Sequence, residues 1–532
     1  MKLKQFFKNF YGNIKEGVLR FPVAFICTIL FFAVSSIDIV FNVYNSDLVI
    51  SLLLTFALTA VFSVFLKTLQ EYINEHIGGV IRTILSVLAA VICFVLTNIY
   101  IDSLYMVMAY TGIIIANFCF IFFVIMHGEN RDLAFPRIVS SLIFAGAICT
   151  VLSAGLSICI AAFQFLIYTW GNIYKLYLVV NLFVWVVCFV NIFLSLIPKK
   201  DVPVQQSKMF RAFVLFAGLP LYMLLIVILL VYLAKIVVTW NMPVGEINWF
   251  ASFASLFFIF FLLSVMQYKE KIAKLYVKFG GYFLAPVLVM QAIAVFERIN
   301  AYGLTTPRTV SLVLIIISIL FIVGSLVVPK HLNKIALASG IIVLIVTITP
   351  LNVIDMPIHS QTNLLKSVLV ANNMLKDGTV TPDPDISEAD KEKILSAYGY
   401  LRYDAKNTPD FIPGKNKSTL EIFGFENTGD SSHYEYCIFR AKESADITNY
   451  NTILKVNDND DIVKFEHKGK KYEVDLKDIA ENLYAEYGTE GYDLDLYKID
   501  EDTALYLTNL SFGVEDGVIA YCYFDGFVLL KN

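Results

Sequence analysis

The chain has 532 residues, of which 58% are hydrophobic and 16% are charged, and phenylalanine alone contributes 44 side chains. A water-soluble fold could not bury that much apolar surface, so the composition excludes an ordinary soluble protein. Residues 1–352 carry 23 Lys/Arg and 12 Asp/Glu, whereas residues 353–532 carry 18 and 33. Because nucleic acids and anionic lipid surfaces attract basic patches, the acidic second part argues against nucleic-acid binding.

Residues 1–20 form a basic lead before the first apolar stretch. Its apolar residues recur at helical spacing with lysines between them, which favours an amphipathic helix on the inner leaflet. The alternative is a solvated lead that only sets topology. The first apolar stretch is about 20 residues long and has no small-residue cleavage pattern after it, so it predicts an uncleaved signal anchor. The apolar residues of the lead are Leu3, Phe6, Phe7, Phe10, Tyr11 and Ile14.

Residues 21–352 contain eleven apolar stretches, each roughly long enough to cross a hydrocarbon core about 30 Å thick as a helix. The sequence therefore predicts an all-α polytopic membrane bundle of eleven transmembrane helices in contact with the lipid bilayer. The expected spans are roughly 21–41, 48–66, 81–101, 105–126, 138–162, 176–197, 212–240, 247–267, 280–297, 309–329 and 335–352.

Basic residues are concentrated on alternate connections, nineteen against three. The positive-inside rule assigns the basic side to the cytoplasm, so the amino terminus is expected inside and residues 353–532 outside. Trp170, Trp240 and Trp249 fall at expected outer ends, as an aromatic interface belt predicts. The nineteen are Lys2, Lys4, Lys8, Lys15, Arg20, Lys67, Arg82, Arg131, Arg137, Lys199, Lys200, Lys208, Arg211, Lys269, Lys271, Lys274, Lys278, Lys330 and Lys334, and the three are Lys175, Arg298 and Arg308.

Residues 353–385 predict a connecting helix, Ser360 to Leu375, and a linker broken by prolines. Residues 386–532 predict an acidic extracytoplasmic α+β domain with an antiparallel sheet. It begins with a helix over roughly 388–402 that Ser387 and Asp390 would cap. A hairpin turn is expected at Lys468 and Gly469, followed by a helix over roughly 477–487. Cys437 and Cys522 lie in two of its strand-like segments, and whether they form a disulfide stays open.

Motifs for chemistry are scarce. The sequence has no GxSxG, P-loop or GxGxxG pattern, and its six histidines form no zinc-ligand spacing, so no catalytic residue, cofactor or metal is predicted. The acidic run Asp458, Asp460 and Asp461 lacks the glycine and the closing glutamate of a calcium loop, which favours a solvated turn.

Four charged residues fall within the expected spans, all toward the outer side: Asp38, Lys235, Glu297 and Arg298. Such positions are within reach of snorkelling, and for Lys235 snorkelling or a structural ion pair competes with substrate contact. Arg298 begins a connection on the expected outer side, which is otherwise poor in positive charge, and this connection contains a second arginine, Arg308. We therefore name Lys235, Arg298, Tyr302 and Arg308 as a candidate contact for an anionic group of a lipid, a wall polymer or the acidic tail itself.

The run Arg298–Arg308, RINAYGLTTPR, resembles the "RI..YG.T..R" signature of a bacterial multi-pass family catalogued as domain of unknown function four-one-five-three. A second stretch, Pro220-Leu221-Tyr222 followed by Tyr232, Lys235, Trp240, Pro243, Gly245 and Trp249, is similar to the family's long span and outer "W.(L/M)P.G...W" turn. Ser360-Gln361 is similar to its closing "S..SQ" segment, although the usual preceding tryptophan is replaced around Leu351. The resemblance covers roughly residues 20–370. The family has no established activity, so the resemblance implies a membrane protein and transfers no catalytic residue.

Three functional classes remain. The first is an envelope receptor, scaffold or regulator that displays the outer domain and binds an envelope protein through residues 386–532. The second is a transporter for a small or lipid-like anionic substrate, although the spans have no charge near the midplane and no internal repeat. The third is a membrane enzyme acting on lipid-linked substrates. It is the weakest, because the connection from Phe41 to Asp47 is too short for an acidic catalytic loop.

Overall fold

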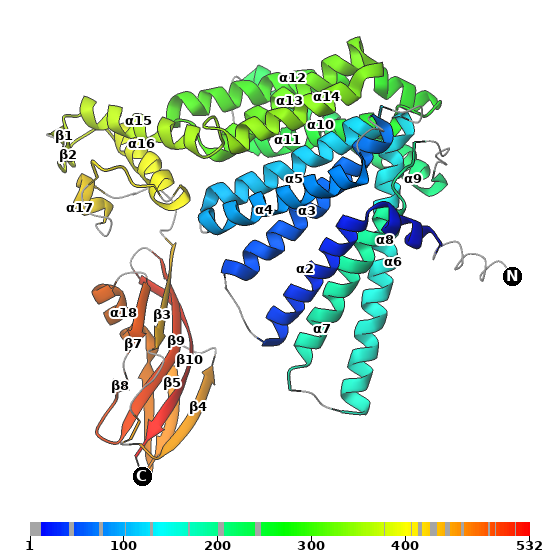
Figure 1. Ribbon diagram of the computed structural model, residues 1–532. Helices are drawn as coiled ribbons and strands as arrows, with labels where there is room; N and C mark the ends of the chain where they lie inside the picture. The colour runs from blue at the N-terminus through cyan, green and yellow to red at the C-terminus, as the bar shows by residue number, and fades with distance from the viewer. Residues whose placement is uncertain are drawn as a thin grey trace. The chain divides into compact units, whose positions relative to one another are not determined.

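The computed structural model describes residues 12–41, 47–73, 78–101, 103–127, 131–168, 171–200, 207–239, 246–376, 378–405, 407–412, 418–425, 434–441, 447–448, 450–458, 462–487, 490–494, 496–515 and 518–531 (Figure 1). It divides into two compact units, residues 1–426 and residues 427–532. Each unit is described by itself below.

The first unit is a helical bundle. Among the described residues, eleven helical segments are long and apolar enough to cross a membrane, which confirms the predicted polytopic bundle. Two of these spans contain a turn of π-helix, η1 and η2, where the α-helical hydrogen bonding shifts by one residue. The elements are α2 (Pro22–Phe41), α3 (Asp47–Tyr72), α4 (Gly79–Tyr100), α5 (Leu104–Ile125), α6 (Arg131–Leu166), α7 (Ile173–Leu182), η1 (Phe183–Cys188), α8 (Phe189–Ser195), α9 (Lys208–Phe213), η2 (Val214–Gly218), α10 (Leu219–Thr239), α11 (Glu246–Val265), α12 (Lys271–Tyr302), α13 (Thr306–Val327), η3 (Pro329–His331) and α14 (Leu332–Ile348).

Residues 12–20 are helical, and residues 1–11 of the predicted basic lead lie outside the described residues. Two of the three tryptophans of the predicted interface belt, Trp170 and Trp240, also lie outside them. Trp249, on the first turn of α11, is 66% exposed, as a side chain in contact with the membrane interface would be.

Small and hydroxyl-bearing residues occupy buried positions in the bundle alongside large apolar ones such as Leu219 and Leu284. On α3, Ser51, Thr55, Thr59 and Ser63 recur every fourth residue and are at most 8% exposed. Gly112 of α5 lies so close to α14 that a Cβ there would clash with Thr347. Lipid tails are as apolar as leucine, so helices in a bilayer gain little from burying apolar area and associate through close packing, which small residues permit.

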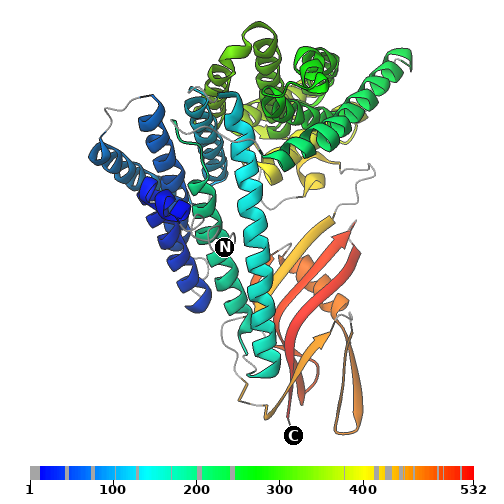
Figure 2. The same cartoon turned by 90° about the vertical axis from the view of Figure 1, so that its right-hand side faces the viewer.

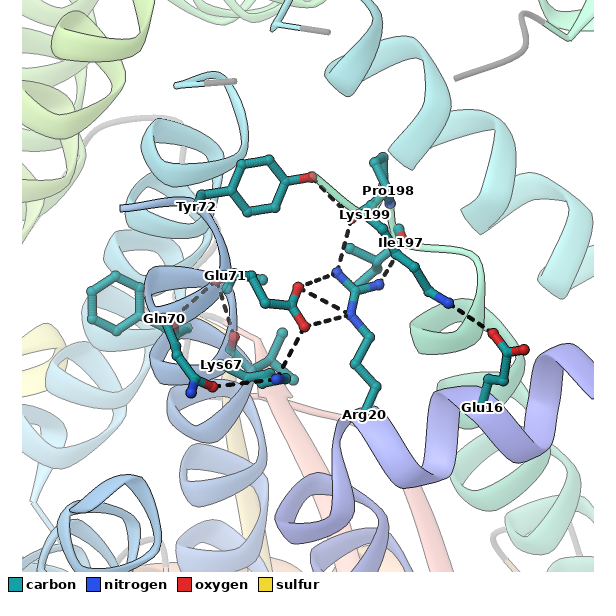
Figure 3. A network of polar contacts seen from close by, with 12 residues as sticks. Glu16, Arg20, Lys67, Gln70, Glu71, Tyr72, Ile197, Pro198 and Lys199 are labelled. Atoms are coloured by element: carbon teal, nitrogen blue, oxygen red, sulfur yellow. Dashed lines mark hydrogen bonds and ion pairs between the residues drawn. The ribbon is translucent and has the colours of Figure 1, made fainter. Parts of the chain in front are cut away.

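A buried ion pair joins three segments at one end of the bundle (Figure 3). Arg20 lies two residues before α2, and its side chain is 7% exposed. Its Nη2 donates to a Glu71 carboxylate oxygen on α3 at 2.7 Å, and its Nη1 donates to the Ile197 carbonyl beyond α8 at 2.7 Å. Nη2 also donates to the Pro198 carbonyl at 2.9 Å, which in addition accepts the Tyr72 hydroxyl at 3.0 Å. This network fastens α2, α3 and the segment after α8 to one another.

We predict that Glu71→Ala strongly destabilises the bundle. The substitution leaves the Arg20 charge buried without its carboxylate, and breaking a buried pair in this way costs about 3 kcal/mol. Thermal unfolding of the purified protein in detergent should show a clearly lower midpoint. Glu16→Ala is the matched control, because the Glu16–Lys199 pair has side chains 64% and 46% exposed and should leave the midpoint unchanged. Equal midpoints for Glu71→Ala and the wild type would contradict the role of the pair.

Residues 353–425 form a small module that packs on the other end of the bundle; we call it the docked module. Its core contains Leu365 of α15, Ile394 and Tyr398 of α16, and Phe423 of α17, and this core also contacts Met108 of α5 and Val346 of α14. The Ser387 hydroxyl accepts the Asp390 N–H at the start of α16, as the sequence predicts. The elements are α15 (Asp355–Ala371), β1 (Leu375–Lys376), β2 (Thr379–Val380), α16 (Glu388–Gly399), the π-helical turn η4 (Tyr400–Asp404) and α17 (Thr419–Phe423).

The docked module shifts the domain boundary expected from the sequence. We expected an outer domain to begin at residue 386, whereas the compact units divide between residues 426 and 427. The physical reason is apolar packing: Ile394, Tyr398 and Phe423 are at most 1% exposed and share a core with α15. Residues 388–425 therefore fold with the bundle rather than with the strands that follow.

The second unit is built on a sheet whose strands run in the order β4-β10-β9-β3-β7, with β8 also paired to β9 (Figure 2). Strand β7 runs parallel to β3, so the sheet is mixed and not wholly antiparallel as expected. The predicted hairpin turn is confirmed: Lys468 and Gly469 have φ of 49° and 76°, the left-handed values of a type I′ turn. The elements are β3 (Tyr434–Ala441), β4 (Thr452–Asp458), β5 (Ile462–His467), β6 (Lys470–Asp475), α18 (Leu476–Tyr487), β7 (Glu490–Leu494), β8 (Tyr497–Lys498), β9 (Thr503–Glu515) and β10 (Val518–Leu530).

The strand register answers the open question about a disulfide in the second unit. Cys437 on β3 and Cys522 on β10 both pair with Phe512 on the intervening strand β9. Neighbouring strands lie about 4.8 Å apart, so the two Cα atoms are separated by about 10 Å. A disulfide needs Cα atoms within about 7 Å, and the two cysteines are not bridged.

Asp500 links the β5–β6 hairpin of the second unit to the turn before β9. Its carboxylate accepts the Thr503 hydroxyl at 2.7 Å, the Tyr472 hydroxyl at 2.8 Å and the Asp502 N–H at 3.0 Å. These hydrogen bonds, those from Thr503 and Tyr472 first, hold the pKa of the Asp500 carboxyl well below its usual range. Asp500 and Asp502 thus belong to a hydrogen-bonded turn.

Candidate binding site at the turn between α12 and α13

The turn that joins α12 to α13 holds most of the predicted site residues. Helix α12 ends at Tyr302, and Gly303 follows with φ of 71° and ψ of 177°, a conformation that side chains with a Cβ strongly disfavour. The Gly303 N–H bonds the Ile299 carbonyl at 2.8 Å. Thr305 then takes an extended conformation, and Pro307 lies in the first turn of α13, where its fixed φ suits a helix start. The motif residues therefore build a tight helix–turn–helix connection.

Helix α15 of the docked module satisfies the exposed backbone of this turn. The Gln361 side-chain amide donates to the Tyr302 carbonyl at 2.8 Å and to the Leu304 carbonyl at 2.9 Å. The adjacent Ser360 hydroxyl accepts the Leu304 N–H at 2.9 Å. A Cβ on Gly303 would lie 3.0 Å from the Gln361 amide nitrogen, so glycine also permits the close approach. The two family-like motifs, distant in sequence, thus bind each other directly.

A second contact joins Thr306, at the start of α13, to Tyr400 of the docked module. The Thr306 hydroxyl donates to the Val353 carbonyl at 2.7 Å, so its oxygen is left to accept the Tyr400 O–H at 2.8 Å. The Tyr400 oxygen also lies 3.3 Å from the Thr306 N–H, which donates to it. Tyr400 thereby caps one of the free N–H groups at the beginning of α13.

A third contact fixes the start of α15 itself. The Asn352 side-chain oxygen accepts the N–H groups of Ile354 and Asp355 at 2.8 and 2.7 Å, and its amide donates to the Asp355 carboxylate at 2.7 Å. The Tyr105 hydroxyl at the start of α5 donates to the same carboxylate at 2.6 Å. The docked module is therefore hydrogen-bonded to α5 and α13 as well as to the end of α12.

The structure brings three of the four predicted site residues together. The half-buried Arg308 donates from Nη1 to the carbonyls of Tyr302 and Gly303. The Tyr302 hydroxyl donates to the Glu392 carboxylate of α16 at 3.0 Å, and Arg298 lies close enough to Tyr302 and Arg308 to act on both electrostatically. Within the part of the chain that the structure describes, no carboxylate forms an ion pair with either arginine.

Lys235 lies apart from this group. It is an exposed residue near the end of α10, and no contact of its side chain with Arg298, Tyr302 or Arg308 occurs among the described residues. The following residues, 240–245, which contain Trp240, Pro243 and Gly245 of the second motif, lie outside the described residues.

Two site residues were not selected from the sequence. Glu392 lies on α16 and Tyr400 on η4, beyond the stretch that carries the family motifs, and nothing in their local pattern indicates that they contact residues about 90 positions earlier. Thr306 and Gln361 do belong to the motifs quoted above, and those motifs were the sequence signal that pointed to this turn.

Among the described residues no group of three or more His, Cys, Asp or Glu is placed to hold a metal ion.

We predict that Gln361→Ala loosens the docked module. The substitution removes the amide donor of the Tyr302 and Leu304 carbonyls. Arg308 still donates to the first, whereas the second loses its side-chain donor, and an unsatisfied buried polar group costs about 1–3 kcal/mol. Gly303→Ala should act in the same direction, because its conformation is disfavoured by about 1–3 kcal/mol for residues with a Cβ. Hydrogen–deuterium exchange in α15 and α16 should become faster in both variants. Ser367→Ala, on the exposed side of α15, is the control, and exchange equal to this control would refute the docking role.

Comparison with known proteins places the motif-bearing part of the chain in a family. The family model described as Domain of unknown function (DUF4153) matches residues 8–377, more than half of the chain. No curated protein and no solved structure matches the chain. The match ends just after α15, so it includes the α12–α13 turn and the Ser360–Gln361 segment that binds it, and it leaves out α16 and the second unit. The chain, with its eleven candidate membrane spans among the described residues, belongs to the DUF4153 family.

Proposed function

We propose that this protein is a receptor or scaffold of the bacterial envelope, in which the membrane bundle displays residues 427–532 outside the cell to an envelope protein. The observation that carries the proposal is the separation of these residues as a compact unit with its own core. They hold 22 acidic and 10 basic residues, so the complementary partner surface is basic.

The arrangement of the bundle supports the proposed orientation. Arg20, Lys67 and Lys199 lie together around the Pro198 segment at the end opposite the docked module (Figure 3). Basic residues near span ends favour the cytoplasmic side. With that end inside, the last span carries the docked module and the second unit to the outer side of the membrane.

The sheet of the second unit offers a recognition surface. One face packs against α18 and the β5–β6 hairpin, through Val463, Ile479 and Ala480. The alternate residues of β10 point to the other face, where the Tyr521 and Tyr523 rings lie 5.0 Å apart and Tyr523 is 53% exposed. Tyrosines supply large contact area with a polar tip, and they are enriched in protein interfaces.

We predict that chemical crosslinking in native membranes captures a stoichiometric basic partner with the intact protein, and that a chain ending at Glu426 captures none. Tyr523→Ala should lower the yield of the partner about tenfold, since interface tyrosines often carry 1 kcal/mol or more. The control is Glu466→Ala on the hairpin, an exposed residue away from the tyrosine face. Capture of the same partner by the shortened chain would refute display through the second unit.

A second candidate function is binding or transport of a small or lipid-like anionic substrate. The observation that favours it is that Arg298 and Arg308 lie close enough for their like charges to repel each other, and that neither forms an ion pair with a carboxylate among the described residues. An anion placed between them would relieve this repulsion. Arg308 already donates to turn carbonyls, so Arg298 is the better residue to test.

We predict that Arg298→Gln weakens binding of phosphatidylglycerol about fivefold, the effect of about 1 kcal/mol per basic residue at an anionic headgroup. Native mass spectrometry of the purified protein would measure this binding, with phosphatidylcholine as the neutral reference lipid. Lys235→Gln removes a charge that lies outside the arginine pair, and it should leave the phosphatidylglycerol affinity near the wild-type value. Equal effects of the two substitutions would remove the case for a specific anion site.

A further inference from the structure

A cavity of about 360 Å³ lies between the docked module and the bundle. Its walls come from three parts of the first unit: the start of α5, the start of α13 and the docked module. This volume falls within the range of about 300–1,000 Å³ that is usual for small-molecule sites. The lining includes Leu104, Met108, Pro307, Ile354, Tyr400 and Ala405.

The chemistry of the lining selects an apolar occupant. Leucine, methionine, proline, isoleucine and alanine make most of the wall, and no charged side chain contributes. The hydroxyls of Thr306 and Tyr400, which also line the cavity, are engaged with each other and with Val353. Water needs two to four polar partners to fill a cavity, and this lining offers few free ones.

The position of the cavity indicates where the occupant comes from. Leu104 and Thr306 are the first residues of two spans, so the cavity lies at the level where these helices leave the bilayer. Leu104 is itself 39% exposed, and Val107 on the next turn of α5 is 56% exposed. The cavity wall is thus continuous with the lipid-facing surface of α5, and the neighbouring leaflet is a ready source of hydrocarbon chains.

We propose that this cavity binds an acyl chain of a bilayer lipid, held between α5, the start of α13 and the docked module. Ile354 and Ala405 lie beyond the spans, so a lipid that only surrounds the bundle would not reach both. An acyl chain in the cavity would contact them and the turn residue Pro307 together. The inference is independent of the proposed receptor role.

The test uses the full-length protein in nanodiscs of palmitoyl-oleoyl-phosphatidylcholine that contain a small fraction of the same lipid with a diazirine at the end of its palmitoyl chain. After irradiation, peptide mass spectrometry should find adducts on peptides containing Ile354 or Ala405. Labelling of the largely exposed helix α4, which any surrounding lipid reaches, is the internal reference for the probe fraction.

Ala405→Trp places an indole in the cavity and should lower the Ile354 adduct about tenfold, because the volume for the chain is filled. Ala371→Trp, at the exposed end of α15, is the matched control and should keep the wild-type adduct. Absence of adducts at Ile354 and Ala405 in the wild type would overturn the proposal, whether or not the variant folds. Equal adducts in Ala405→Trp and Ala371→Trp would overturn it as well.

Discussion

The structure of the first unit depends on one constraint: the backbone groups of the α12–α13 turn must find partners where the helices leave the bilayer. Gln361 supplies donors to two carbonyls of this turn, and Ser360 accepts one of its N–H groups. Because an unsatisfied polar group is costly in a low-dielectric setting, these hydrogen bonds between α15 and the turn hold α15 in place. The Tyr400 contact with Thr306 and the Tyr105 bond to Asp355 hold the docked module at the same end of the bundle.

At the opposite end of the bundle, the segments are held together by the ion pair between Arg20 and Glu71. Arg20 and Glu71 are both largely buried, with side chains 7% and 21% exposed. The arginine also donates hydrogen bonds to two backbone carbonyls. A buried pair of this kind contributes little net stability relative to apolar packing, but loss of one partner is severe. Such a pair selects one arrangement of α2, α3 and α8. The family match covers both ends, which agrees with the bundle and α15 acting as one structural unit.

The residues beyond the family match divide into two parts with different roles. Residues 388–425 bury Ile394, Tyr398 and Phe423 against α15 and enlarge the docked module. Residues 427–532 have a separate core and most of the acidic excess. The hydrogen bonds of Gln361, Glu392 and Tyr400 to the bundle therefore all lie outside residues 427–532.

The amino-acid sequence by itself determined the membrane bundle and its eleven spans, because a hydrocarbon solvent requires about 20 consecutive apolar residues for each helix. It also marked the hairpin turn at Lys468 and Gly469, since local turn chemistry needs no distant partner. Tertiary structure alone decided the contacts between distant residues: Gln361 with Tyr302, Tyr400 with Thr306, and Arg20 with Glu71. It likewise separated Cys437 from Cys522 by one strand and placed residues 388–425 with the bundle. These outcomes depend on helix packing and strand register, which periodicity and composition along one chain do not specify.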